Sequence, residues 1–110
     1  MNAVDFDLTA LVAEFKQAMQ ALYGDRLANV ILYGSYARGD FHAESDVDFM
    51  VVLRGGELNR LQELERTTDV LVHLLDKYGR LVSLMSTTED IYYTNNFLFY
   101  QNVRRDGKIL

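Results

Sequence analysis

Cysteine is absent from this sequence, which excludes disulfides, thiolate nucleophiles and zinc–thiolate sites together. Long apolar runs are absent too, because none approaches the roughly 20 residues that span a bilayer. The acidic start, residues 1–7, does not resemble a signal peptide, which begins with a basic region. We therefore expect a cytoplasmic protein that has no membrane association.

Clustered positive charge is the third absence. The net charge is −5, and the 11 basic residues are dispersed apart from pairs such as Arg104-Arg105. A protein that binds duplex nucleic acid needs a concentrated basic patch, so direct duplex binding is not expected. A small phosphorylated substrate held through a metal is compatible with this charge.

The residues that are present make an ordinary globular composition. Hydrophobic residues are 49% and aromatic residues 12% of the 110 positions, which is enough for a single core. No repeat or low-complexity linker divides the chain. We expect one domain, residues 1–110.

Hydrophobic spacing predicts helices that alternate with a few strands, hence an α/β (α+β) fold with a small sheet. In the first half we expect a helix from Asp7 to Tyr23 and strands from Leu27 to Tyr33 and from Asp46 to Leu53. A long helix follows Gly55-Gly56 and is capped by Gly79, and a third strand runs from Arg80 to Ser86. A capping box at Ser86 to Glu89 then begins a helical turn, a last helix runs from about Asn95 to Arg105, and a short tail follows Gly107. The residues expected on the buried side of the long helix are Leu58, Leu61, Leu64, Thr68, Leu71, Leu75 and Tyr78.

One stretch carries the chemistry: "VILYGSYARGDFHAESDVDFMVVL", residues 30–53. Side chains alternate along a strand, so Asp46 and Asp48 share one face, roughly 6.6 Å apart along the backbone. Two such carboxylates can converge on one cation or bridge two, and without a cation they raise one another's pKa. Hard oxygen ligands of this kind suit Mg²⁺, which takes its remaining ligands from waters and substrate phosphates.

Gly34 and Ser35 supply the complementary half of the motif. A glycine directly after a strand lets the backbone turn sharply and approach a ligand. If "SYARG" begins a short helix, its free N–H groups and the Ser35 hydroxyl form an anion site, within reach of Arg38. Each feature alone is commonly a turn or a solvated edge. Their combination favours a nucleotide and metal site for nucleotidyl or phosphoryl transfer.

Gly34-Ser35, a ten-residue spacer and Asp46-Val47-Asp48 resemble the signature of the polymerase-β-like nucleotidyltransferases, and most closely the minimal nucleotidyltransferases. The resemblance implies a mixed sheet flanked by helices, with ATP as donor and Mg²⁺ as cofactor. It assigns triphosphate binding to Gly34 and Ser35, with Arg38 as a weaker match, and metal binding and catalysis to Asp46 and Asp48.

The sequence departs from that pattern at Ser83. Active members of the family generally carry a third carboxylate on the strand after the long helix, where this chain reads "LVSLMS". A serine hydroxyl is a poor metal ligand and cannot act as a carboxylate base. Glu89 and Asp90 are the alternative suppliers, although helix capping and first-turn charge explain them more simply.

Many minimal nucleotidyltransferases resemble the antitoxin of a pair whose toxin is a HEPN-domain ribonuclease. The resemblance implies a Mg²⁺-dependent protein adenylyltransferase that transfers AMP from ATP to a toxin tyrosine, in a hetero-oligomer with that toxin. The alternative is a catalytically degenerate relative that neutralises its toxin by stoichiometric binding. A small-molecule nucleotidyltransferase is a weaker third hypothesis, because those enzymes carry an additional substrate domain.

The aromatic segment Ile91 to Tyr100 is the expected contact surface for a partner, since aromatic residues supply much of the energy at interfaces. His42, in a polar loop, is expected to face solvent. His73 is expected at the surface or boundary of the long helix.

Overall fold

The computed structural model describes residues 6–110, so most of the acidic start considered above lies outside the described residues. The elements, in chain order, are α1 (Leu8–Tyr23), the 3-10 turn η1 (Gly24–Arg26), β1 (Leu27–Tyr33), α2 (Ser35–Arg38), β2 (Val47–Leu53), α3 (Arg60–Tyr78), β3 (Val82–Thr88), α4 (Glu89–Thr94), α5 (Leu98–Asp106) and β4 (Lys108–Ile109).

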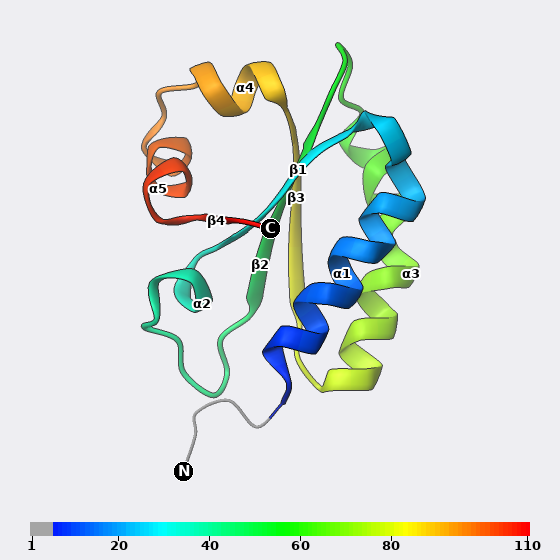
Figure 1. The fold of residues 1–110 in the computed structure, drawn as a ribbon, viewed down its shortest axis with the longest axis vertical. Helices are drawn as coiled ribbons and strands as arrows, with labels where there is room; N and C mark the ends of the chain where they lie inside the picture. Colours follow the sequence, from blue (N-terminus) through cyan, green and yellow to red (C-terminus); the bar gives the residue numbers. More distant parts are fainter. Residues whose placement is uncertain (1–5) are drawn as a thin grey trace.

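The sheet is mixed, with the strand order β3-β2-β1-β4. β2 runs antiparallel to β1 and parallel to β3. β4 pairs antiparallel with β1, along the edge of β1 that faces away from β2. Helices α1 and α3 cover one face of this sheet, while α4 and α5 cover the other (Figure 1). The predicted fold, a small mixed sheet flanked by helices, is therefore confirmed.

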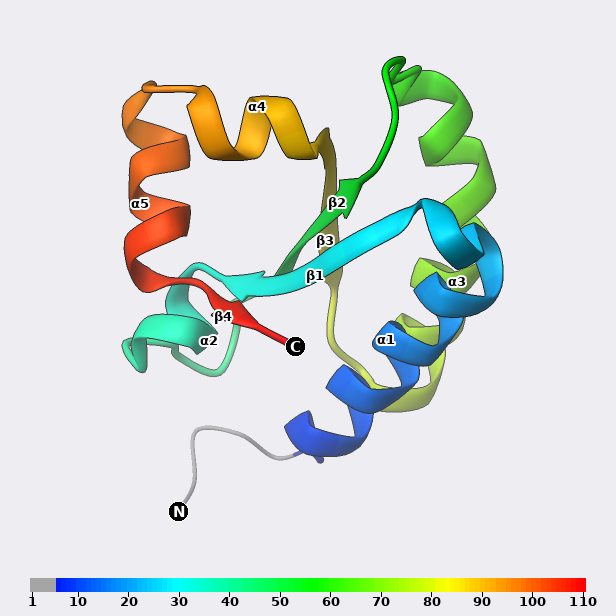
Figure 2. The ribbon, with the colours of Figure 1, turned by 45° about the horizontal axis from the view of Figure 1, so that its top comes forward.

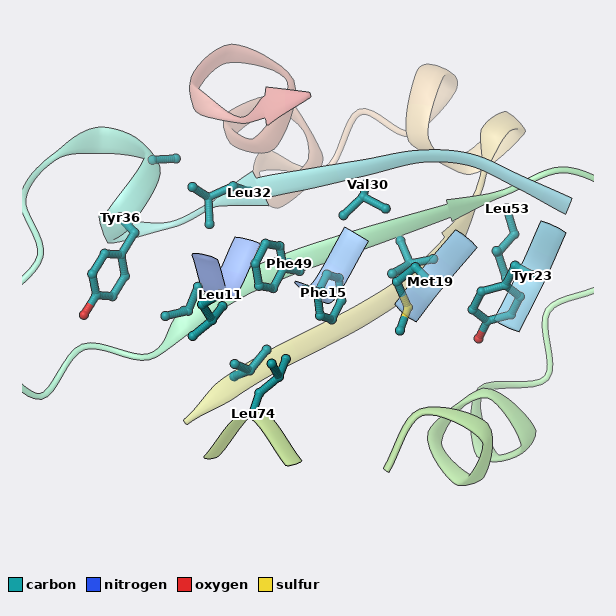
Figure 3. Packing of buried hydrophobic residues seen from close by; sticks show 14 residues of the cluster. Leu11, Phe15, Met19, Tyr23, Val30, Leu32, Tyr36, Phe49, Leu53 and Leu74 are labelled. Atoms are coloured by element: carbon teal, nitrogen blue, oxygen red, sulfur yellow. The ribbon is translucent and has the colours of Figure 1, made fainter. Parts of the chain in front are cut away.

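Alternation along the strands separates two apolar clusters. The larger one lies under α1 and α3, where the rings of Phe15 and Phe49 stack with centroids 4.0 Å apart (Figure 3). The smaller one faces α4 and α5, and its buried members are Ile31, Met50, Val52, Tyr92, Tyr100 and Val103. Asp48 shares the strand face of Met50 and Val52. The predicted carboxylate face is thus the one that α4 and α5 cover.

The long helix is rotated relative to the prediction. Leu61, Leu64 and Leu75 were expected in the core but are 67%, 56% and 43% exposed, whereas Glu63, Thr67 and Leu74 are buried. Leu58, Leu71 and Tyr78 pack only partly against the core, and Thr68 is exposed.

Glu63 gives the physical reason for this rotation. Its carboxylate accepts a hydrogen bond from the Tyr23 hydroxyl at 3.0 Å and pairs with Arg26 at 3.3 Å and Arg66 at 3.2 Å. A buried carboxylate requires such partners, and two of them, Tyr23 and Arg26, lie at the end of α1 and in η1. Hydrophobic spacing alone could not distinguish this face from the leucine face.

The C-terminal third also differs in its boundaries. β3 runs two residues beyond the expected end, since it pairs with β2 up to Thr88 opposite Leu53. The cap of α4 is therefore Thr88, whose hydroxyl accepts the Ile91 N–H, and the expected capping box at Ser86 is wrong. The tail after Gly107 is a strand, β4, instead of a free end.

Gly79 caps α3 in the left-handed conformation, as predicted. Asp7 caps α1, and both early strands lie within one residue of their expected bounds. No helix within residues 6–110 is long and apolar enough to cross a membrane.

Candidate functional site

The end of β1 meets the start of β2 at the candidate site. In the antiparallel register Tyr33 lies opposite Asp48, and in the parallel register Asp48 lies opposite Ser83. The three side chains therefore form one row across the sheet, on the side of α4 and α5. Ser83 occupies the strand position next to Asp48, where the resemblance places a third acid. Asp46, one residue before β2, is exposed.

Gly34 connects β1 to α2 in a conformation that other residues rarely adopt, with φ 73° and ψ −155°. A Cβ atom on Gly34 would lie 2.2 Å from the Oδ2 atom of Asp48. The missing side chain therefore lets the carboxylate approach the backbone at the start of α2. Gly39 ends this short helix, and its N–H donates to the Ser35 carbonyl at 2.9 Å.

The Asp48 carboxylate is the group in the site that most needs a ligand. It accepts no hydrogen bond and forms no ion pair within residues 6–110. Burial raises its pKa, the charge of Asp46 raises it further, and Arg38 partly offsets both. Burial, with a smaller contribution from Asp48, also raises the pKa of Tyr33 to about 12, so the phenol stays neutral. A cation would relieve the cost of this half-buried charge.

Two adjoining cavities share Ser35, Arg38 and Asp48 as walls. The first, of about 330 Å³, runs under α5, and its remaining lining residues are Tyr33, Gly34, Phe99, Asn102, Val103 and Asp106. The second, of about 470 Å³, is lined further by the loop residues Asp40, His42, Glu44, Ser45 and Asp46. The predicted residues Gly34, Ser35, Arg38 and Asp48 thus lie together, while Asp46 lines only the second cavity.

Arg38 lies between acidic groups of both cavities. Its Nε donates to Asp40 at 3.2 Å, and its charge contributes to lowering the pKa of Asp106, after that of Arg105. A phosphate group brought into the shared wall would meet this guanidinium and the N-terminal N–H groups of the turn at Ser35.

The donor set fits a hard, oxygen-preferring ion. Within residues 6–110 no three acidic or histidine side chains come together as a metal group. Asp46 and Asp48, which line the same cavity, would supply carboxylate oxygens to such an ion and leave its other ligands to waters and phosphates. That is the arrangement Mg²⁺ favours when waters and phosphates complete its coordination.

Glu89 and Asp90 do not belong to this site. They begin α4 at the far end of β3, with Glu89 six residues beyond Ser83, or roughly 20 Å along the strand. Their place in the first turn of α4 agrees with the simpler interpretation given above. His42 is exposed, and exposed His73 lies 3.4 Å from Glu14, both as expected.

The motif does not predict the wall that α5 contributes to the first cavity. Phe99, Asn102 and Asp106 lie far from the motif in the chain, and the tertiary structure brings them there by placing α5 next to α2 (Figure 2). Their spacing of three and four residues, one face of a helix, was the available signal.

The chain is similar to known proteins along most of its length. The model of the nucleotidyltransferase domain family matches residues 12–104. "Putative protein adenylyltransferase MJ0604" of Methanocaldococcus jannaschii is 33% identical over 100 residues, which cover 90% of this chain and 93% of that protein. "Putative protein adenylyltransferase MJ0141" of the same organism is 35% identical over 77 residues, covering 70% and 76% of the two chains.

Solved structures agree on the fold. The structure described as "the toxin-antitoxin with AMP-PNP" matches with a TM-score of 0.65 at 21% identity, over 88% of this chain and 69% of that chain. A likeness at this identity shows a common fold and carries no statement about ligands of this chain.

Replacing Gly34 by alanine tests the close approach to Asp48. We expect Gly34→Ala to abolish thermal stabilisation by millimolar Mg–ATP, because the new Cβ displaces the carboxylate. Gly39→Ala is the matched control, since φ is 88° there but no atom lies within 4 Å of its Cβ. Both changes strain the backbone, by roughly 1 kcal/mol or more. Equal loss of the Mg–ATP effect in both variants would contradict the prediction.

Replacing Asp48 by asparagine tests its need for a cation. Because the pKa of Asp48 is raised, its ionised form lowers stability above that pKa, and the penalty vanishes below the ordinary value of 3.8. In chelator at pH 7, Asp48→Asn should melt no lower than wild type, with the difference shrinking toward pH 3.8. Mg–ATP should stabilise wild type, by about 2.7 kcal/mol at a hundredfold excess over Kd, and leave the variant unchanged. A variant that melts well below wild type in chelator would refute this reasoning.

Proposed function

This chain belongs to the nucleotidyltransferase domain family. On that basis we propose that it transfers AMP from Mg–ATP to a hydroxyl group of a partner protein, with pyrophosphate as the leaving group. The partner proposed is a HEPN-type toxin, modified on a tyrosine, so that the chain acts as an antitoxin. Curated relatives that cover most of the chain carry the name protein adenylyltransferase. A toxin–antitoxin structure shares the fold.

The single observation that carries the proposal is the Asp48 carboxylate, which has no partner within residues 6–110 and lies against Gly34. Gly34 and Ser35 would bind the β- and γ-phosphates, and Arg38 would contact them from the shared wall. Asp46 and Asp48 would hold Mg²⁺, which neutralises phosphate charge and orients the α-phosphate when bound. The acceptor hydroxyl would approach from the open second cavity.

A stable contact surface for the partner is proposed on the exposed apolar residues at the start of α5. Phe97 and Leu98 are 73% and 69% exposed, and Tyr93 of α4 is 57% exposed. Tyr100, from the expected aromatic segment, is buried and belongs to the core instead. This surface also supports the second candidate function, a degenerate antitoxin that acts by occupancy alone, which Ser83 beside Asp48 favours.

Ser83→Asp tests whether the missing acid limits the reaction. Since Ser83 lies opposite Asp48 on the parallel strand β3, the new carboxylate would lie next to the metal-binding pair. We expect AMP transfer from labelled ATP to increase, by tenfold or more if an added base acts as general bases usually do. The control for an added carboxylate is Thr94→Asp, because Thr94 is exposed on α4. Thr87→Asp is unsuitable, since Thr87 is buried. Strong labelling by wild type, with no gain over Thr94→Asp, would show that the third acid is not needed.

Co-expression with the toxin separates catalysis from occupancy. A catalytic antitoxin should protect cells at substoichiometric levels, whereas one that acts by occupancy must match the toxin and bury a lasting interface of roughly 1,200 Å² or more. We expect Asp46→Ala/Asp48→Ala to abolish both rescue and labelling of the toxin. Phe97→Ala/Leu98→Ala should weaken rescue by raising the amount of antitoxin required. Undiminished rescue by the double aspartate variant would overturn the enzymatic proposal.

A further inference from the structure

We propose that the cavity under α5 is the nucleoside subsite, in which Phe99 stacks on the adenine and Asn102 reads its hydrogen-bonding edge. This inference rests on the proposed function, since it assigns the base of the bound ATP to one side of the phosphate site. The sequence motif contains neither residue.

The position of the cavity limits what can occupy it. It shares Ser35, Arg38 and Asp48 with the second cavity, so a triphosphate held at that wall extends its nucleoside into one of the two. The second cavity is bordered by Asp40, Glu44 and Asp46, whose charges suit a base poorly. Its imidazole ring, that of His42, is exposed and accepts the Glu44 N–H at 3.2 Å. The cavity under α5, about 330 Å³ with Tyr33 and Phe99 in its wall, lies within the size range of small-molecule sites.

Phe99 is held in a way that leaves surface for a ligand. Its ring meets Tyr33 edge to face, with centroids 5.7 Å apart at 87°, and meets Tyr100 similarly at 5.3 Å and 79°. The side chain is still 39% exposed although it lines a cavity. Base–aromatic stacking at such a ring strengthens binding by roughly 5- to 150-fold.

Asn102 differs from the amides around it. Asn95 accepts the Phe97 N–H at 2.8 Å, and Gln101 donates to the Asn96 carbonyl at 2.7 Å. The Asn102 amide lines the cavity and has no hydrogen-bond partner within residues 6–110. An amide offers a donor and an acceptor side by side, which match N7 and the 6-amino group of adenine, whereas guanine presents two acceptors there.

The placement of α5 is set by close packing. A Cβ atom on Gly107 would lie 2.5 Å from the Val103 carbonyl oxygen and 2.7 Å from Cγ2 of Ile31. Directly after it, β4 pairs with β1, with Ile109 opposite Ile31. The end of α5 is therefore held against the central strand, and Asn102 lies one turn before that anchor. Because α5 is held in place, Asn102 can discriminate between nucleobases instead of moving to fit each of them.

Calorimetric titrations with Mg–ATP, Mg–GTP and Mg–tripolyphosphate separate the subsite from the phosphate site. We expect wild type to bind Mg–ATP at least tenfold more tightly than the other two. Phe99→Ala and Asn102→Leu should each lower the affinity for Mg–ATP about tenfold and leave the affinity for Mg–tripolyphosphate unchanged. Asn102→Leu should also reduce the preference for Mg–ATP over Mg–GTP. Phe99→Tyr, which keeps the ring, should bind like wild type. The control variants are Leu61→Ala, exposed on α3, and Gln101→Leu, next to Asn102 but not among the lining residues of the cavity. Neither should change the affinity for Mg–ATP or for Mg–tripolyphosphate.

The outcomes distinguish this inference from the proposed function. If wild type binds neither Mg–ATP nor Mg–tripolyphosphate, the proposed function fails and the subsite fails with it. If wild type binds both with equal affinity, the phosphate site stands and the nucleoside subsite is overturned. If Phe99→Ala lowers the affinity for both ligands equally, the effect is structural, and the assignment of the nucleoside subsite to α5 is likewise overturned.

Discussion

The antiparallel pairing of β1 with β2 is the constraint on which the rest of the candidate site depends. It brings the end of one strand against the start of the other, so that Gly34 and Asp48 meet although 13 residues lie between them in the chain. The approach of Asp48 to the Gly34 backbone requires both this register and a residue without a Cβ. A shift by one residue would turn Asp48 toward α1 and α3, and the carboxylate would enter the larger core.

Burial and chemistry compete on the two faces of the sheet. The face toward α1 and α3 is apolar throughout its buried cluster, and it stabilises the domain. The face toward α4 and α5 holds the smaller cluster, and its outer end carries Asp48. Holding an ionised carboxylate at that position costs free energy, which the raised pKa of Asp48 reflects. The second carboxylate, Glu63, is buried but paired within the protein itself, by the Tyr23 hydroxyl and by Arg26 and Arg66.

Local signals predicted the elements well wherever capping and hydrophobic spacing agreed. The bounds of α1, β1 and β2 followed from apolar runs that end at glycine or aspartate. The face of α3 did not follow, because two stripes on that helix have helical spacing and only the partners of Glu63 decide between them. The start of α4 was wrong for a related reason, since its true cap, Thr88, also closes the pairing of β3 with β2.

The sequence by itself predicted the chemistry of the candidate site, because Gly34, Ser35, Asp46 and Asp48 lie within one stretch whose strand alternation needs no tertiary knowledge. It also places Ser83 at the position where the resemblance implies a third acid. Only the tertiary structure decided which residues complete the cavities. Glu89 and Asp90 lie close to Ser83 in the chain but at the far end of β3. Phe99 and Asn102 come from a helix whose position depends on β4 and on the packing of Gly107, which are long-range contacts that no local pattern encodes.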